Sequence, residues 1–257
     1  MSIERLNTIC PYYTMYPLQF PLRVLRCAQP KKWVLDPFCG RGTTNFAARL
    51  LGLNNVGFDA SPIAVAIASA KLLRVSPLEV ITEAQRILTS KREAEVPEGK
   101  FWQYAFHRRT LVDICRLRQS IGVMPRTPAQ LTLRALVLGT LHGPLTKSRP
   151  SYFSNQCPRT FAPKPAYAIR FWKKHGFQPR QVDAMDLIAR RARHCLTLQP
   201  GLVEGYIRQG DARDPYIFDA TWLGRRADSP PVGCPAGSSA KWRPITHSTN
   251  LKTVGLV

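Results

Sequence analysis

The spacing of apolar residues divides the chain into an α/β beginning and a longer helical middle. Residues 31–38 and 55–58 contain short apolar runs that end in turn residues, as strands do. Residues 43–51 and 63–73 instead repeat apolar positions at helical spacing. Strand, helix, strand and helix in this order predict a βαβ unit, whose two strands lie parallel in one sheet.

The rest of the chain is expected to be mainly helical at first and irregular at its end. Residues 77–145 carry apolar stripes at helical spacing, residues 143–180 are interrupted by six prolines, and residues 181–196 return to a helical pattern. A short strand is expected near residues 205–207. From about Thr221 the periodicity is lost, and Gly, Pro, Ser and Thr dominate.

These patterns predict four regions. Residues 1–76 form a cofactor-binding βαβ half with a loop segment before it, and residues 77–200 form a helical and basic insertion. Residues 201–232 return to the sheet, and residues 233–257 form an irregular tail. The expected fold class is therefore α/β, a Rossmann-like sheet with a mainly helical insertion.

The charge balance favours a polyanionic partner. The 257 residues include 37 Lys and Arg against 16 Asp and Glu, which gives a net charge of +21 and a pI near 10.3. Nucleic acid suits such an excess, because each neutralised phosphate releases counterions. No apolar run reaches the roughly 18 residues of a membrane helix, and residues 1–10 lack the apolar centre of a secretory signal. We therefore expect a cytoplasmic protein without membrane contact.

The seven cysteines are scattered and give no sign of a metal site. None forms a Cys-x-x-Cys pair, and no pair of histidines has the spacing of zinc ligands. Reduced thiols and no bound metal are therefore expected. The pattern does not indicate an oligomeric state.

The stretch from Asp36 to Thr44 has the composition of a cofactor loop, because it follows a strand and opens a helix. Gly40 and Gly42 let the backbone turn sharply and approach a ligand without Cβ clashes. The helix N-terminus offers unpaired N–H groups, and Thr43 and Thr44 add hydroxyls. Asp36, at the start of the stretch, can face a cationic group of the ligand or an associated water.

A second acidic residue strengthens the prediction of a cofactor loop. Asp59 ends the next strand, where a carboxylate can accept hydrogen bonds from both ribose hydroxyls. A Walker phosphate loop is excluded because no Gly-Lys-Ser/Thr follows. The dinucleotide fingerprint is also absent, since Asn45 stands where its third glycine would be.

Several motifs resemble those of the exocyclic-amino DNA methyltransferases, which methylate cytosine N4 or adenine N6. Residues 36–44 resemble the motif with which these enzymes bind S-adenosylmethionine (SAM), and residues 57–62 resemble their ribose motif. SAM carries no phosphate, so its amino-acid end would take the place of a pyrophosphate, with Asp36 facing the ammonium or an associated water. Residues 15–20 are similar to the segment before the SAM loop, and residues 210–212 are similar to the motif that contacts adenine. The resemblance implies a SAM-dependent methyltransferase sheet and these cofactor-binding residues: Tyr16, Asp36, Phe38, Gly40, Gly42, Thr43, Thr44, Asp59, Ala60, Ser61, Asp211 and Ala212.

The family's catalytic motif is Asp, Asn or Ser followed by Pro-Pro and an aromatic residue, which holds the target amino group and stacks on the flipped base. Its one candidate here is Ser229-Pro230-Pro231, whose Ser form favours cytosine over adenine by resemblance. Val232 departs from the pattern, because a valine cannot stack on a base. A Pro-Pro pair in an irregular tail is the alternative interpretation.

The sudden loss of pattern suggests that the tail after about Asp219 is altered by truncation or a change of reading frame. The leading interpretation is a DNA methyltransferase, in a restriction-modification system or a phage. An RNA methyltransferase and an inactive, truncated SAM- or DNA-binding remnant remain as alternatives. Residues 145–180 would supply DNA contacts through their cations, namely Lys147, Arg149, Arg159, Lys164, Arg170, Lys173 and Lys174, while Phe171 and Trp172 are expected in the core.

Overall fold

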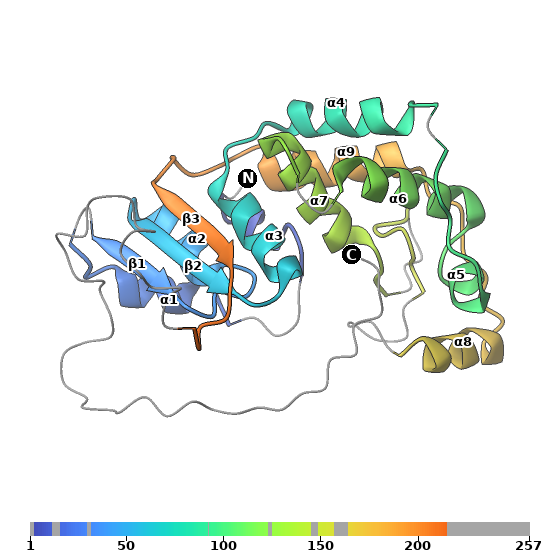
Figure 1. Ribbon diagram of the computed structural model, residues 1–257, viewed down its shortest axis with the longest axis horizontal. Coiled ribbons are helices and arrows are strands. Elements are labelled where there is room, and N and C mark those ends of the chain that lie inside the picture. Colours follow the sequence, from blue (N-terminus) through green and yellow to red (C-terminus); the bar gives the residue numbers. More distant parts are fainter. Residues whose placement is uncertain are drawn as a thin grey trace.

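The computed structural model describes residues 3–11, 16–29, 32–91, 93–122, 125–144, 149–156 and 164–214. A small parallel sheet lies beside a larger group of helices (Figure 1), which confirms the predicted α/β class. In chain order the elements are the 3₁₀ helix η1 (Ile3–Thr8), α1 (Gln19–Leu25), β1 (Trp33–Asp36), α2 (Thr43–Leu50), β2 (Asn54–Asp59), α3 (Pro62–Leu72), α4 (Pro77–Leu88), α5 (Lys100–Ala105), α6 (Arg108–Ile121), α7 (Pro128–Thr140), α8 (Pro165–Lys174), α9 (Ala184–Leu196) and β3 (Gly205–Gln209).

The sheet has the order β1-β2-β3, and both pairings are parallel. Leu35 is in register with Val56, and Val56 is in register with Tyr206, so β2 is the central strand. The short strand expected near residues 205–207 therefore joins the sheet beside β2, although almost 150 residues separate the two strands in the chain. Among the described residues, β1 has no second neighbour.

The helices α2 and α3 cover the same face of this sheet. Asn45 of α2 donates a hydrogen bond to Asn55 of β2, with 3.0 Å between the amide nitrogen and oxygen. A Cβ added at Gly205 of β3 would lie 2.9 Å from Leu72 of α3. Right-handed crossovers that proceed in one direction along a sheet place their helices on one face, as these do.

Aromatic side chains lie on the opposite face of the sheet. The rings of Trp33 and Tyr206 stack with their centroids 6.2 Å apart and their planes 9° apart. They come from the two outer strands, whereas Val56 and Phe58 between them are both 5% exposed. The face of the sheet away from α2 and α3 is thus apolar.

The helical region has its own apolar core. Leu117 of α6, Leu133 of α7 and Leu187 of α9 are fully buried there, and α4 packs along α9. The helix α8 packs on α5 through Trp172, whose indole N–H donates to the carbonyl of Gln156 at 2.7 Å. The expectation that Trp172 is a core residue is therefore confirmed. No helix among the described residues is long and apolar enough to cross a bilayer.

Pattern analysis did not predict α8, because residues 143–180 contain so many prolines. In the structure Pro165 occupies the first turn of α8, where a proline has no hydrogen bond to lose. Pro62, Pro77 and Pro128 hold the same position in α3, α4 and α7. Four helices in the described part of the chain thus begin at a proline.

Arg49 joins the sheet to the helical region. This side chain of α2 is 2% exposed, and its guanidinium donates four hydrogen bonds to backbone carbonyls. Two acceptors, Lys71 and Leu73, lie at the end of α3, at 2.5 and 2.8 Å. The other two, Pro200 and Gly201, lie just before β3, both at 2.9 Å. One buried cation thus ties both ends of residues 74–199 together.

We predict that Arg49→Met lowers the free energy of unfolding by at least about 3 kcal/mol, since it leaves buried carbonyls unsatisfied. Urea denaturation measures the loss. Arg86→Met is the control, because the Arg86 side chain is exposed and pairs with Glu83 on the same helix, and it should cost under about 0.5 kcal/mol. Equal losses in the two variants would contradict the central position of Arg49.

Candidate cofactor site

The candidate site lies where β1 and β2 end. Asp36 is the last residue of β1, and its carboxylate accepts the Phe38 backbone N–H at 3.1 Å, which starts the turn. Gly40 and Gly42 have φ values of +52° and +71°, in the left-handed region that favours glycine. The loop is then closed by the N–H of Gly42, which donates to the carbonyl of Cys39 at 2.7 Å.

The two glycines differ in what surrounds them. A Cβ added at Gly42 would lie 2.7 Å from the Cβ of Ala68, so the loop and α3 touch backbone to backbone here. A Cβ added at Gly40 would meet nothing within 4 Å. Gly42 therefore serves packing, whereas Gly40 leaves open space on the side of the loop where a ligand could approach.

Asp59 connects the two halves of the site. One carboxylate oxygen accepts the backbone N–H of Gly40 at 2.9 Å, and the other accepts that of Ser61 at 2.8 Å. Ser61 in turn caps α3 by accepting from Ala64. A carboxylate has about four lone-pair positions, so each oxygen keeps capacity for a further donor. Neighbouring Ala60 is exposed.

The segment before β1 meets the loop through Tyr16. Its hydroxyl forms a hydrogen bond with the Thr44 hydroxyl, and its ring packs edge-on against Phe20. Burial raises the pKa of Tyr16, and the nearby Asp36 carboxylate raises it further. Phe38 is 66% exposed, which leaves an aromatic ring at the rim of the loop. Tyr16, Asp36 and Thr44 therefore lie close together at the loop.

Other loop residues turn into the protein. Thr43 is 2% exposed, so of the two threonines Thr44 lies at the rim. Cys39 is also buried, and burial next to Asp36 and Asp59 raises the pKa of its thiol, which makes it a poor nucleophile. Arg41 is 5% exposed, and its guanidinium donates to the carbonyl of Asn7.

The buried side of the loop contains a polar contact that sequence reasoning missed. Lys71 of α3 is fully buried, and its Nζ donates to the Asn7 side chain at 2.7 Å. Burial and the nearby Arg41 guanidinium keep the pKa of Lys71 well below its usual range. Asn7 thus joins η1 to both the loop and α3. Hydropathy patterns could not reveal this, because they score Lys and Arg as surface residues.

The structure shows what Asn45 does at the position where the dinucleotide fingerprint has its third glycine. It is fully buried at the strand-facing side of α2. The close approach of helix and strand occurs instead at Gly57 of β2, where an added Cβ would lie 3.0 Å from the Asn45 amide. A glycine on the strand, and not one on the helix, therefore permits the close approach of α2 and β2.

Asp211 lies near the same edge of the sheet. The N–H of Gly210 donates to the carbonyl of Asp59 at 3.1 Å, so the turn of Asp211 and Ala212 after β3 begins beside the end of β2. The Asp211 carboxylate pairs with the Arg213 guanidinium, whose hydrogen bonds hold its pKa at about 2. Asp211 is therefore ionised, and its carboxylate is already paired with Arg213.

The predicted catalytic residues Ser229, Pro230 and Pro231, with Val232, lie outside the described residues, as does Met15 of the preceding segment. No cluster of metal-ligating residues is present in the described part of the chain.

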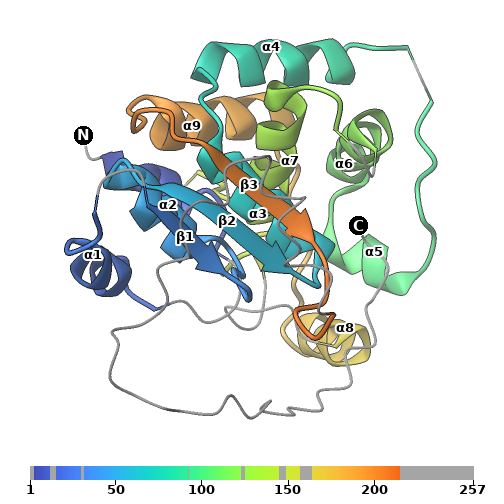
Figure 2. The same cartoon turned by 60° about the vertical axis from the view of Figure 1, so that its left-hand side comes forward.

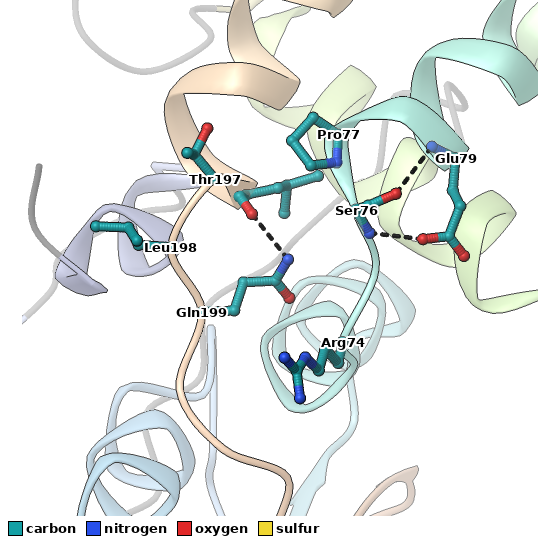
Figure 3. A pocket seen from close by; sticks show the side chains of 8 residues that line it. Arg74, Ser76, Pro77, Glu79, Thr197, Leu198 and Gln199 are labelled. Carbon is teal, nitrogen blue, oxygen red and sulfur yellow. Dashed lines mark hydrogen bonds between the residues drawn. The ribbon is translucent and has the colours of Figure 1, made fainter.

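A surface hollow of about 560 Å³ lies elsewhere, between the start of α4 and the end of α9 (Figure 3). Its polar groups already engage one another. Ser76 and Glu79 form the capping box of α4, and the Gln199 amide donates to the carbonyls of Val75 and Leu196. We interpret this hollow as the joint where the helical region meets the sheet.

The comparison with known families concerns the same part of the chain. Residues 4–70 match the family model described as DNA methylase, of the N6 and N4 type. The matched stretch includes Tyr16, the loop and Asp59, and it ends within α3. It confirms the resemblance to exocyclic-amino DNA methyltransferases. No curated protein and no solved structure matches the chain.

The two loop glycines give a matched pair of substitutions. Gly40→Ala should lower the free energy of unfolding by about 1–2 kcal/mol, the usual cost of a left-handed residue. Gly42→Ala should cost a further 1–3 kcal/mol or so, because its new methyl group overlaps Ala68. Urea denaturation of both variants tests this, and equal losses would show that the loop and α3 do not touch as described.

Proposed function

From the DNA methylase match over residues 4–70, we propose that this chain transfers a methyl group from SAM to an exocyclic amino group of a DNA base. The observation that carries the proposal is the meeting of Asp36, Gly40 and Asp59 at the ends of two adjacent parallel strands. Ligands of open α/β sheets bind at this edge. The matched family supplies the reaction and the DNA substrate.

The residues around the loop suit the amino-acid end of SAM. The Asp36 carboxylate would pair with the ammonium group, and the N-terminus of α2 favours the carboxylate. Tyr16 and Thr44, already joined by a hydrogen bond, would close over this end. Open space beside Gly40 lets the backbone come close to the ligand.

The nucleoside would bind along the ends of β2 and β3. Asp59 would accept hydrogen bonds from the ribose hydroxyls with the lone pairs that Gly40 and Ser61 leave unused. Asp211 would accept from the adenine amino group, and Ala60, Ser61 and Ala212 would contact the nucleoside beside it. Phe38 at the rim offers an apolar surface to the same ligand.

Bound SAM supplies an electrophilic methyl group on its sulfonium. We propose that the Ser229 side chain and one backbone carbonyl of the Ser229-Pro230-Pro231 motif accept the two hydrogen bonds of the target amino group, which makes its nitrogen more nucleophilic. The Ser form of the motif favours cytosine N4 over adenine N6. Val232 offers no aromatic ring for the flipped base, and this favours an inactive remnant as the second candidate function.

Substitutions of two aspartates should distinguish binding of the amino-acid end of SAM from binding of its nucleoside. Asp36→Asn should weaken SAM binding by about 10–100-fold, because it removes a charged hydrogen bond. It should leave 5′-methylthioadenosine, which lacks the amino-acid end, unaffected. Asp59→Asn should weaken both ligands. Calorimetry with Asp113→Asn as a remote control tests this, and equal effects of the two variants on both ligands would contradict the assignment.

The methylated base identifies the function. We predict that the full chain, incubated with SAM and DNA of mixed sequence, produces N4-methylcytosine, detected by mass spectrometry after digestion to nucleosides. Ser229→Ala should abolish the product while SAM binding remains. N6-methyladenine would overturn the preference for cytosine, and methylation of RNA in preference to DNA would indicate the RNA enzyme. SAM binding without any product would identify an inactive remnant.

A further inference from the structure

The excess positive charge is concentrated in one part of the chain. Residues 99–182 contain fifteen Lys and Arg but a single acidic residue, Asp113, so two thirds of the net charge of +21 falls on this stretch. Asp113 itself lies 3.8 Å from the guanidinium of Arg116. Such a field attracts polyanions.

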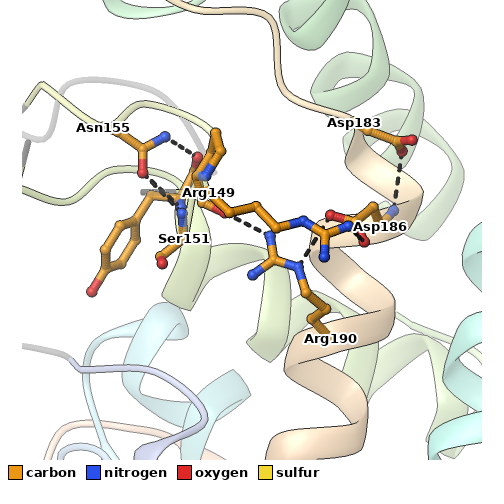
Figure 4. Close-up of polar contacts among 8 residues, drawn as sticks. Arg149, Ser151, Asn155, Asp183, Asp186 and Arg190 are labelled. Carbon is orange, nitrogen blue, oxygen red and sulfur yellow. Dashed lines mark hydrogen bonds and ion pairs between the residues drawn. The ribbon is translucent and has the colours of Figure 1, made fainter. Parts of the chain in front are cut away.

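Some cations of this stretch serve the fold. Arg149 pairs with Asp186 of α9 at 2.5 Å, and Arg190 binds the same carboxylate at 3.1 Å (Figure 4). Arg190 also donates to the carbonyl of Pro150, so these contacts fasten residues 149–156 to α9. Arg149, which the sequence placed among the DNA contacts, is thereby engaged by a carboxylate.

The cations of α8 are arranged differently. Arg170, Lys173 and Lys174 are exposed at i, i+3 and i+4 spacing, which places them on one side of the helix. Among the described residues, Arg170 and Lys174 form no ion pair. Lys173 lies 6.0 Å above the Tyr104 ring. Lys164 before the helix is exposed too.

The helix that carries these cations is held in place by packing on its other side. Ala168 and Trp172 are buried on the side of α8 that faces α5. Phe171 stacks on Tyr167 at 6.4 Å and contacts the His175 ring at 4.2 Å, so aromatic packing continues past the end of the helix. The cations therefore extend from a helix whose opposite side is packed against the rest of the protein.

The helix α8 lies at the same edge of the molecule as the carboxyl ends of the strands, where the cofactor loop is. In both views α8 lies at the lower edge of the molecule, toward which the strands point, whereas α4 lies at the opposite edge (Figures 1 and 2). A long polyanion that reaches the carboxyl ends of the strands can therefore extend along the same side to α8.

We propose that the exposed side of α8, with Lys164, Arg170, Lys173 and Lys174, binds the phosphate backbone of duplex DNA beyond the base that is methylated. This inference rests on the proposed function for the choice of DNA. The surface positions the duplex and reads no sequence, because lysines and arginines on phosphates carry none.

The test compares two double variants of the full chain. Arg170→Gln/Lys174→Gln removes two charges from α8. Lys91→Gln/Arg193→Gln removes two exposed charges outside α8, one after the end of α4 and one on α9. Binding of a fluorescein-labelled DNA duplex of mixed sequence is measured between about 50 and 200 mM salt. The α8 variant should bind about ten-fold more weakly, and its plot of log K against log salt should be shallower by about 2.

The control variant should match the wild type in both affinity and slope, and Lys174→Gln alone should change the slope by about 1. SAM binding, measured in parallel, should be unchanged in all variants. A salt slope in the α8 variant equal to that of the control would overturn the proposal. If duplex RNA displaced the labelled DNA at a lower concentration than unlabelled duplex DNA does, DNA would be overturned as the partner. DNA binding that depends on α8 in a chain that fails to bind SAM would support this surface while the proposed function fails.

Discussion

The four hydrogen bonds of the Arg49 guanidinium are the contact on which the rest of the architecture depends. They hold the end of α3 and the strand-entry segment before β3 against one buried side chain. The acceptors are neutral carbonyls, so the charge is solvated by backbone dipoles instead of by a counterion. Burial and the nearby Arg74 lower the pKa of Arg49 to about 10, which leaves it charged at neutral pH. The helical region can thus extend far from the sheet while its two ends stay fixed.

A similar arrangement holds the cofactor loop. Arg41 and Lys71 are buried beneath it and donate to Asn7 of η1, while Asp59 receives backbone N–H groups from both sides. The loop is therefore fixed by contacts on its inner side, which leaves the open side of Gly40 and the rim residues Tyr16 and Phe38 for a ligand. Because the inner contacts fix the loop and its outer side stays open, the site is preformed, and ligand binding would require little reordering of the backbone.

The sequence predicted the elements whose patterns are local. The βαβ unit and the strand at 205–207 were both visible in short windows, and the family match over residues 4–70 confirms the family resemblance of that stretch. The helix α8 was missed because prolines were interpreted as interruptions. Arg49 was missed because a pattern cannot tell a buried arginine from an exposed one. Its acceptors lie 22 to 152 residues away in the chain, and no local signal carries that information. The pairings of Arg149 and Asp211 were hidden for the same reason.

Hydrogen–deuterium exchange of the full chain with and without SAM tests the central claim most directly, because it locates the ligand on the backbone. The account predicts slower exchange in residues 36–46 and 58–64 when SAM is present, and no change in α7. Protection confined to the hollow between α4 and α9, or no protection anywhere, would contradict the assignment of the loop as the SAM site.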